Sequence, residues 1–250
     1  MSRHCFGSTH RQRGLMLRGK LHRQATLWFI ALCVSYLALA YFAAPEFWSL
    51  RFLRDGPRPE SLLTTTEQGI PGDPINIGLV GSELDVTAAF AAAGWDRADK
   101  LSVKSALEIG ESVLLDRPYV DAPVSTLLFN GRRQDLAFEK PVGKSADVRH
   151  HVRLWLTFTP GADGRPTWYG AASFDRGIGV SHDTGAVTHH IGPDIDAERD
   201  SLIGDLTSAG RIIEVKTMSG IGLTKAGRNG EGDPYYTDGK MLMAVLVPDR

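Results

Sequence analysis

The longest uninterrupted hydrophobic stretch of the chain runs from Ala25 to Ala44 and contains no charged residue. A helix of this length extends about 30 Å, which matches the hydrocarbon core of a bilayer. Trp28 lies near one end of the stretch, and Tyr41 and Trp48 lie near the other. Aromatic side chains favour the two membrane interfaces. The pattern therefore predicts one transmembrane helix over these residues.

Basic residues stand before this helix. Residues 1–24 contain six arginines and lysines and no acid. A positive flank of this kind stays in the cytoplasm, so residues 1–24 are expected to be a basic cytoplasmic tail and the remainder to be exported. Two fates fit the pattern: a signal anchor that is retained, which we favour, or a signal peptide cleaved after the small residues at Ala38 to Ala40.

The segment after the helix changes character. Residues 45–72 contain four prolines and no periodic apolar face, which is typical of a linker. Regular alternation of apolar and polar residues begins shortly after Asp73. A folded domain is therefore expected from residue 73 to residue 250.

The first part of this domain combines a strand with two helices. Residues 75–80 alternate and predict a strand. Ser82 and Asp85 have the spacing of a capping box at the start of an alanine-rich helix, and Gly94 is placed to end that helix. Residues 101–115 place apolar side chains on one helical stripe and predict a second helix.

The pattern after Pro118 is dominated by strands. Short runs with strand character are bounded by Gly, Pro or Asp, and their short gaps favour antiparallel neighbours. The runs cover 124–131, 133–142, 148–160, 166–181, 211–218 and 240–248. A helix is predicted over 194–210 and a long glycine-rich loop over 219–239. This order predicts an α+β domain, mainly an antiparallel sheet with helices packed on it, preceded by the one transmembrane helix.

Alternation along residues 148–158 separates two sets of side chains. His150 shares a face with apolar residues and is predicted to be a core histidine. Arg149, His151 and Arg153 point to the opposite face. If this run and the next pair as a hairpin, Asp175 shares that face with His151.

Overall composition excludes several classes of function. The net charge is −1 and 42% of the residues are hydrophobic, so no global field attracts nucleic acid and no nucleic-acid partner is expected. The two cysteines, Cys5 and Cys33, both precede the predicted domain. A disulfide framework, a thiolate nucleophile and a cysteine-based zinc site are therefore excluded for that domain. It also has no GxSxG elbow and no P-loop.

Polar residues in the second half supply candidate chemistry. His151, Asp175, His189 and His190 are candidate catalytic residues, because histidine titrates near neutral pH and a carboxylate can orient it. Arg149 and Arg153 are candidates for binding an anion by charge-assisted hydrogen bonds. Further ligand types follow in sequence, but no HExxH or other established spacing is present, so no metal or cofactor is assigned.

The segment from Thr188 to Asp200 has two interpretations. His189 or His190 fills a corner between a strand and a helix, while Asp196 and Glu198 stabilise the positive N-terminus of that helix. Alternatively, the same acidic and basic side chains border a polar cleft. In that case Asp196, Glu198 and Arg199 are candidate binding residues.

Four segments together resemble the LssY C-terminal domain, a bacterial family. They are "DPINIGLVGSELDVTAAFAAAGW" (73–95), "GRRQDLAFEK" (131–140), "RHHVRLW" (149–155) and "THHIGPDIDAERDSLIGDL" (188–206). The resemblance extends from residue 73 towards the C-terminus. It implies that the polar set shared by the family falls on Arg149, His150, His151, Asp175, His189, His190, Asp196, Glu198 and Arg199. It implies no catalytic residues.

Two functions agree with these features. The first is a membrane-tethered binding or accessory module whose partners are the lipid bilayer and an envelope or secretion-related protein. The second is a hydrolase that acts on a phosphoryl or lipid head group through a His/Asp/Arg polar cleft. Family members often carry multi-pass membrane segments of the DedA or phosphatidic acid phosphatase type, whereas one anchor is predicted here. The expected location is the bacterial inner membrane, with the C-terminal domain periplasmic or otherwise extracytoplasmic.

Overall fold

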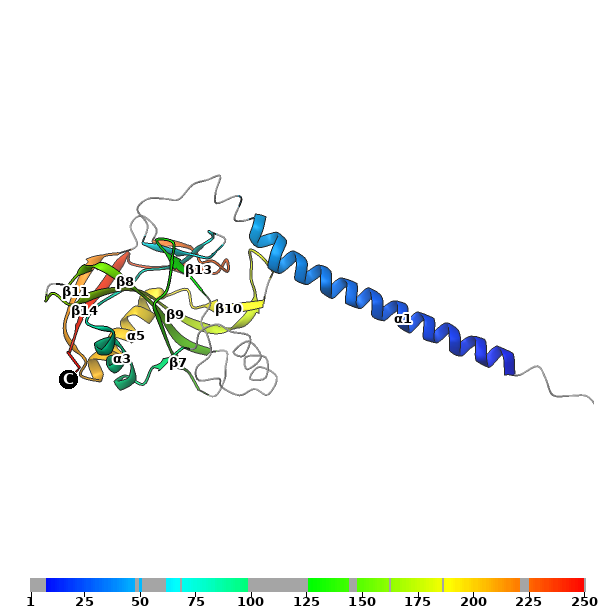
Figure 1. Ribbon diagram of the computed structural model, residues 1–250, viewed down its shortest axis with the longest axis horizontal. Helices are drawn as coiled ribbons and strands as arrows, with labels where there is room; N and C mark the ends of the chain where they lie inside the picture. Colours follow the sequence, from blue (N-terminus) through cyan, green and yellow to red (C-terminus); the bar gives the residue numbers. More distant parts are fainter. Residues whose placement is uncertain are drawn as a thin grey trace, which may run out of the picture.

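A long N-terminal helix carries the hydrophobic stretch and extends away from the remainder of the protein (Figure 1). In this computed structural model, α1 spans Ser8–Ala38 and continues through the π-helix η1, Leu39–Ala43. The apolar segment His22–Phe47 has a mean hydropathy of 2.0 and is 6% buried within its most apolar window. Its length and composition suit a single membrane span, and a signal sequence shares both properties.

The structure describes residues 8–47, 50, 62–67, 69–98, 126–143, 148–161, 163–185, 187–220 and 225–249. The helix predicted over residues 101–115 lies outside the described residues, as does the beginning of the strand predicted over 124–131. The predicted fold class is confirmed, because mainly antiparallel strands carry helices on them and follow the apolar helix.

The main sheet has eight strands in the order β11-β14-β3-β9-β8-β7-β4, with β10 paired to the end of β9. Neighbours are antiparallel except for the parallel pair β14 and β3. The strands are β3 (Ile77–Val80), β4 (Asp96–Arg97), β7 (Leu136–Pro141), β8 (Val148–Pro160), β9 (Pro166–Val180), β10 (Val187–Ile191), β11 (Ile212–Ser219) and β14 (Lys240–Leu246).

Two helices cover one face of this sheet. Helix α3, Glu83–Ala92, opens with the predicted capping box, since the Ser82 side chain accepts from the Asp85 amide and the Asp85 side chain accepts from the Ser82 amide. Helix α5, Ile195–Ser208, is capped by Asp194. Apolar side chains of both helices form the larger hydrophobic core with the sheet; they include Val86, Phe90, Phe138, Val152, Leu154, Leu202 and Leu206.

The opposite face of the main sheet is covered by β-structure. A small sheet has the order β2-β1-β5-β6, formed by β1 (Leu63–Thr65), β2 (Pro71–Pro74), β5 (Leu128–Phe129) and β6 (Arg132–Arg133). A hairpin joins β12 (Ala226–Arg228) and β13 (Pro234–Tyr236) inside the segment predicted to be a loop. A second core lies on this side and contains Ile75, Leu127, Trp155, Ala171 and Met241. Strand β1 lies within residues 45–72, so part of the segment predicted as a linker pairs with the domain.

Candidate functional site

Seven polar side chains lie buried on the face of the main sheet that points away from α3 and α5. The register groups them, because Arg149 stands opposite Asp175 and His151 stands opposite Ser173. Residues directly opposite one another in a sheet point to the same face. We call this group the buried charged cluster. Its members are each at most 4% exposed and are Asp73, Glu139, Arg149, His151, Arg153, Ser173 and Asp175.

Arg149 joins carboxylates from the two neighbouring strands. Its Nε donates to Asp175 Oδ2 at 3.0 Å, and its Nη1 donates to Glu139 Oε2 at 2.5 Å. The other oxygen of Asp175, Oδ1, lies 3.1 Å from His151 Nδ1. Strands β8 and β9 thus pair as the alternation requires and bring Asp175 beside His151.

Arg153 occupies the other side of the His151 ring. Its Nη1 lies 2.8 Å from His151 Nε2 and donates to Asp73 Oδ2 at 2.9 Å. Asp73 belongs to β2, so this contact connects the small sheet to the main sheet. Both ring nitrogens of His151 therefore face charged side chains of the protein itself.

The cluster contains three carboxylates, two guanidinium groups and one imidazole. Burial, the largest influence, would lower the pKa of His151, and the nearby Arg153 acts in the same direction; the Asp175 carboxylate, with a smaller contribution from Asp73, outweighs both, and the pKa of His151 is raised. A protonated His151 brings the formal charge of the cluster to zero. Arg153 opposes this protonation, since a guanidinium group has only donors to offer to the imidazole.

The same contacts lower the pKa of two of the acids. Burial would raise the pKa of Asp73, but the nearby His151, whose Nε2 lies 3.9 Å from Asp73 Oδ2, and the charge of Arg153 outweigh burial and lower it. Burial would also raise the pKa of Asp175, but the charge and close approach of His151, then the charge of Arg149, lower it. His189 contributes more weakly in the same direction, which places it near Asp175.

This arrangement limits what His151 can do chemically. A general acid or base must come within hydrogen-bond reach of the proton that it moves. His151 is 2% exposed and has Asp175 at one ring nitrogen and Arg153 at the other. The cluster thus has the chemistry of a charge-balanced internal network that joins β2, β7, β8 and β9.

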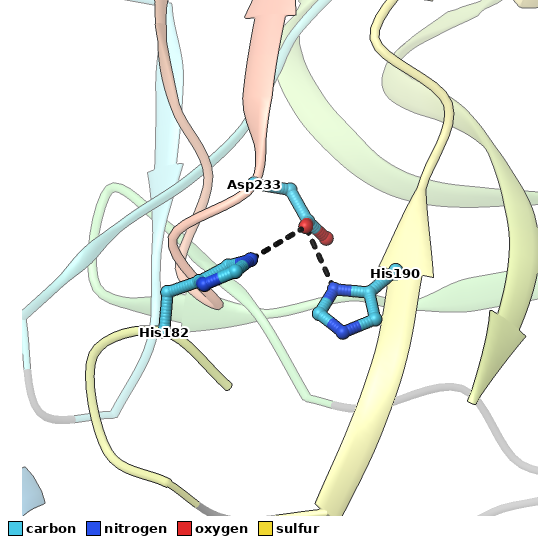
Figure 2. Close-up of side chains that lie close together, drawn as sticks. All are labelled: His182, His190 and Asp233. Carbon is cyan, nitrogen blue, oxygen red and sulfur yellow. Dashed lines mark hydrogen bonds and ion pairs between the residues drawn. The ribbon is translucent and has the colours of Figure 1, made fainter. Parts of the chain in front are cut away.

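A second polar group lies nearer the surface and contains His182, His190 and Asp233 (Figure 2). We call it the His-His-Asp group. His190 Nδ1 lies 2.7 Å from Asp233 Oδ1, and His182 Nε2 lies 3.8 Å from the same oxygen. The Asp233 side chain is fully buried, whereas that of His182 is 57% exposed. The group therefore connects the interior to solvent.

Local structure holds each member of the His-His-Asp group in place. His190 lies on β10, where its ring covers Gly179 of the neighbouring β9; a Cβ atom there would lie 2.2 Å from His190 Nε2. The loop before β13 approaches His182 closely. Gly232 in that loop has a φ of +82°, and a Cβ atom there would lie 2.6 Å from the His182 Cβ. Glycine satisfies both the positive φ and the close contact.

Asp233 is held on both sides, its side chain by a main-chain amide and its main chain by a side-chain oxygen. Its Oδ2 accepts from the Ile191 amide at 2.9 Å, and its own amide donates to Asn229 Oδ1 at 2.9 Å. Glu231 lies in the same loop; burial raises its pKa, and the charges of Asp73 and Asp233 add to the increase. The buried charged cluster and the His-His-Asp group are therefore electrostatic neighbours through Asp73 and Glu231.

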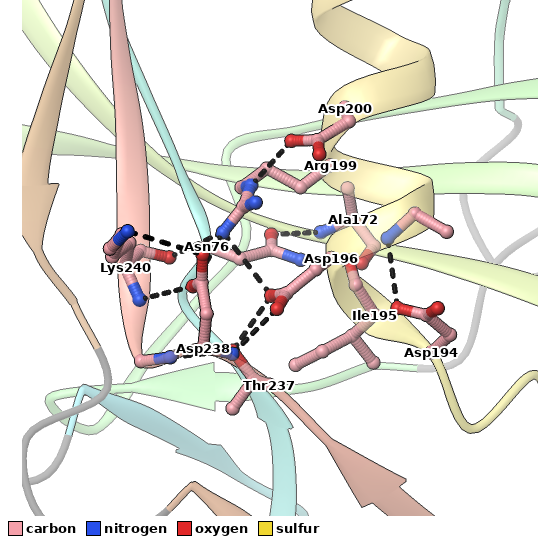
Figure 3. Close-up of polar contacts among 12 residues, drawn as sticks. Asn76, Ala172, Asp194, Ile195, Asp196, Arg199, Asp200, Thr237, Asp238 and Lys240 are labelled. Carbon is pink, nitrogen blue, oxygen red and sulfur yellow. Dashed lines mark hydrogen bonds and ion pairs between the residues drawn. The ribbon is translucent and has the colours of Figure 1, made fainter.

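Two of the other predicted binding residues, Asp196 and Arg199, belong to a separate network at the start of α5 (Figure 3). Arg199 Nη1 donates to Asp238 Oδ1 at 2.9 Å and to Asp196 Oδ1 at 3.2 Å. Asp196 also accepts from Thr237 Oγ1 at 2.7 Å. The Asn76 amide bonds the main chain of Ala172 and Ile195. These contacts attach the helix to β3, β9 and the segment before β14.

Glu198 and His150 form a pair on the helix side of the sheet. His150 Nδ1 lies 2.7 Å from Glu198 Oε2, and its ring packs between Trp95 and Phe174. His150 therefore lies on the apolar face, as the alternation predicts, and is partly buried there. Glu198 lies on the opposite face of the sheet from Arg149 and Arg153. It therefore does not join the buried charged cluster.

The structure thus distributes the predicted site residues over three places. His151, Asp175, Arg149 and Arg153 meet in the buried charged cluster, whereas His190 joins His182 and Asp233. Five members of these groups are not among the candidate site residues of the sequence analysis: Asp73, Glu139, Ser173, His182 and Asp233. Glu139 could have been singled out from the sequence, because it is an acid within the strand-like run 133–142. Asp233 could not, because its loop has no recognised ligand spacing.

These features define a class of protein: an α+β domain with an internal charged network, preceded by one helix suited to a membrane. The chain belongs to the LssY C-terminus family, whose family model matches residues 57–241. The match begins before Asp73 and includes β1, which pairs with the domain. No curated protein and no solved structure gives a significant match to the chain. The family domain and the apolar helix fit a membrane-anchored protein.

Proposed function

We propose that the chain is a membrane-anchored binding or accessory module of the bacterial envelope. Its N-terminus lies in the cytoplasm, its single helix crosses the inner membrane, and its domain lies in the periplasm or is otherwise extracytoplasmic. Asp175 and Arg153 occupy the two ring nitrogens of His151, and this observation favours binding over catalysis. The lipid bilayer is one partner, and an envelope or secretion-related protein is the other partner that we propose.

One contact between the helix and the domain lies inside the apolar segment. The Tyr36 hydroxyl donates to the Gly185 carbonyl at 2.8 Å, and Ala40, one turn further along the helix, is 3% exposed. Residues four apart lie on one face of a helix. Because Tyr36 and Ala40 lie within the predicted span Ala25–Ala44, insertion of the helix into a bilayer requires this contact to break.

Thiol labelling tests the orientation. Cys5 lies in the basic tail, and Ser208 is exposed at the end of α5 on the domain, so Ser208→Cys supplies a matched second thiol. We expect a membrane-impermeant maleimide to label this introduced thiol in intact cells with a permeabilised outer membrane. The same reagent should label Cys5 only after the cells are lysed. The opposite order would reverse the proposed topology. The intact mass of the purified chain separates a retained anchor from a cleaved signal peptide.

The second candidate function is a hydrolase of phosphoryl or lipid head-group substrates. The observation that favours it is the 3.1 Å contact of His151 with Asp175 beside Arg149 and Arg153. A carboxylate that orients a histidine next to anion-binding groups is a known catalytic combination. In this protein the combination requires the small sheet to move away from His151 before a substrate can reach it.

One experiment separates the two candidates. The full chain, purified in detergent, is assayed with p-nitrophenyl phosphate and with phosphatidic acid vesicles, and native mass spectrometry of the same sample shows any retained partner or lipid. The binding proposal expects a retained species and no turnover. Turnover that His151→Gln abolishes and His150→Gln preserves would establish the hydrolase instead.

A further inference from the structure

We propose that His182, His190 and Asp233 bind one divalent transition-metal ion of the zinc type, with one coordination position left for water or an anionic ligand. This inference goes beyond the proposed function, which names no ligand. The three side chains come from two loops and β10, and their ligand atoms all lie within 4.8 Å of one another. Three protein ligands and one open position are the usual composition of a reactive zinc site.

The distances suit a small tetrahedral ion. Ligand bonds of 2.0–2.1 Å to zinc place neighbouring donor atoms about 3.3 Å apart. The separations from Asp233 Oδ1 are 2.7 Å to His190 Nδ1 and 3.8 Å to His182 Nε2, one below and one above that value. Side-chain shifts of about half an ångström therefore bring both histidine nitrogens to this separation from Asp233. The exposed His182 side chain is free to make such a shift.

The surroundings of the three ligands are already fixed. The Ile191 amide holds the second oxygen of Asp233, and Asn229 holds the Asp233 main chain. Gly179 supports the His190 ring, and Gly232 allows the close approach of His182. Outer contacts of this kind orient metal ligands and raise their affinity. Little conformational freedom is lost when an ion binds.

The charge of the site favours a cation. Asp233 is fully buried, and the ion pairs that it makes within the described part of the chain are with His182 and His190. Buried carboxylates need a compensating charge. A dication would thus compensate the carboxylate while the histidines remain neutral ligands.

The ligand types select the class of ion. Imidazole nitrogens suit zinc, cobalt, nickel and copper, whereas magnesium and calcium prefer sites made of oxygen. Two histidines with one carboxylate therefore point to zinc or its spectroscopic substitute cobalt(II). Because the His182 side chain is 57% exposed, the open coordination position faces solvent on its side.

Metal titration of the full chain tests the site. The protein, purified in detergent and stripped with EDTA, is titrated with Co²⁺ while visible absorption is recorded, and then with Zn²⁺. We expect one equivalent of Co²⁺ to give the intense bands of tetrahedral coordination and Zn²⁺ to displace it. His182→Gln and His190→Gln should each weaken binding by about 100-fold or more. His22→Gln, which removes an exposed histidine of the helix, should leave binding unchanged.

The variants are chosen so that folding and binding can be separated. Asp233 also holds the Ile191 amide, whereas the His182 side chain is mostly exposed and its removal leaves the fold intact. Circular dichroism of His182→Gln checks this. Absence of saturable Co²⁺ binding by the wild-type chain, or wild-type affinity in both histidine variants, would overturn the proposal. Neither result affects the thiol-labelling test, so the anchored-module proposal stands or fails separately.

Discussion

Asp175 is the residue on which the buried charged cluster depends most directly. It accepts from Arg149 with one oxygen and lies beside His151 with the other. Buried charges are tolerated only when they are paired, and removing one partner leaves the remaining charge in a medium that solvates it poorly. The loss of a single carboxylate from the cluster should therefore lower the stability of the fold substantially.

Asp175→Asn should lower the free energy of unfolding by about 3–5 kcal/mol, because it leaves Arg149 and His151 incompletely paired inside the protein. Urea denaturation of the full chain in detergent, followed by the fluorescence of the buried Trp95, Trp155 and Trp168, measures the change. Glu214→Gln on the exposed strand β11 is the matched control and should not move the midpoint. An equal midpoint for both variants would show that the cluster contributes little to stability.

The cluster should also make stability depend on pH in both directions. The pKa values of Asp73 and Asp175 are lowered from 3.8, so their contribution is present above about pH 4 and is lost as the pH falls further. The pKa of His151 is raised from 6.5, so its contribution is complete below pH 6.5 and is lost as the pH rises through the raised value. The stabilisation that the buried charged cluster contributes should therefore be greatest between about pH 4 and pH 6.5.

Urea midpoints of the full chain, measured from about pH 3 to about pH 9, check this dependence. His151→Gln should remove the decline on the alkaline side and weaken the decline on the acidic side, because His151 is the main group that lowers the pKa values of Asp73 and Asp175. A wild-type profile that is flat between about pH 6 and about pH 9 would contradict the raised pKa of His151.

The pairing of β10 with β9 determines where the His-His-Asp group forms. His190 stands opposite Gly177 and its ring covers Gly179, while a bulge after His190 sets Ile191 opposite Asp175. The bulge also aims the Ile191 amide at Asp233. A short irregular strand thus supplies one ligand directly and positions a second.

Gly179→Ala tests this role of the strand pair. A methyl group there would lie 2.2 Å from His190 Nε2 and would push the ring away from Asp233. We expect Co²⁺ affinity to fall by about 10–100-fold with the fold preserved. Gly204→Ala is the matched control, because its methyl group meets nothing within 4 Å on the exposed side of α5. It should stabilise the helix slightly and leave Co²⁺ binding unchanged.

The elements whose signals are local could be predicted from the sequence. Ser82 with Asp85 marked the start of α3, and Asn130 with Gly131, both with positive φ, formed the turn between β5 and β6. The meeting of His151 with Asp175 needed only the pairing of two consecutive strands. The contacts of Asp73 with Arg153 and of Asp233 with His190 join residues 80 and 43 positions apart. No periodicity determines such contacts.

The whole chain should behave as an integral membrane protein. The apolar segment His22–Phe47 leaves most of its side chains uncovered by the domain, and this surface is costly to expose to water. After alkaline carbonate washing of bacterial membranes, immunoblotting should find the full-length chain in the pellet. A variant with Leu32 and Val34 both replaced by arginine should move to the supernatant. Full-length wild-type chain in the supernatant would contradict a membrane span.

The bond from Tyr36 to Gly185 joins residues 149 positions apart and lies inside the apolar segment. A helix inserted in a bilayer buries the Tyr36 side chain in hydrocarbon, beyond the reach of a domain that stays outside the membrane. Insertion of the helix therefore requires this bond to break. Insertion would thus release the β9–β10 loop, which carries His182, from the helix.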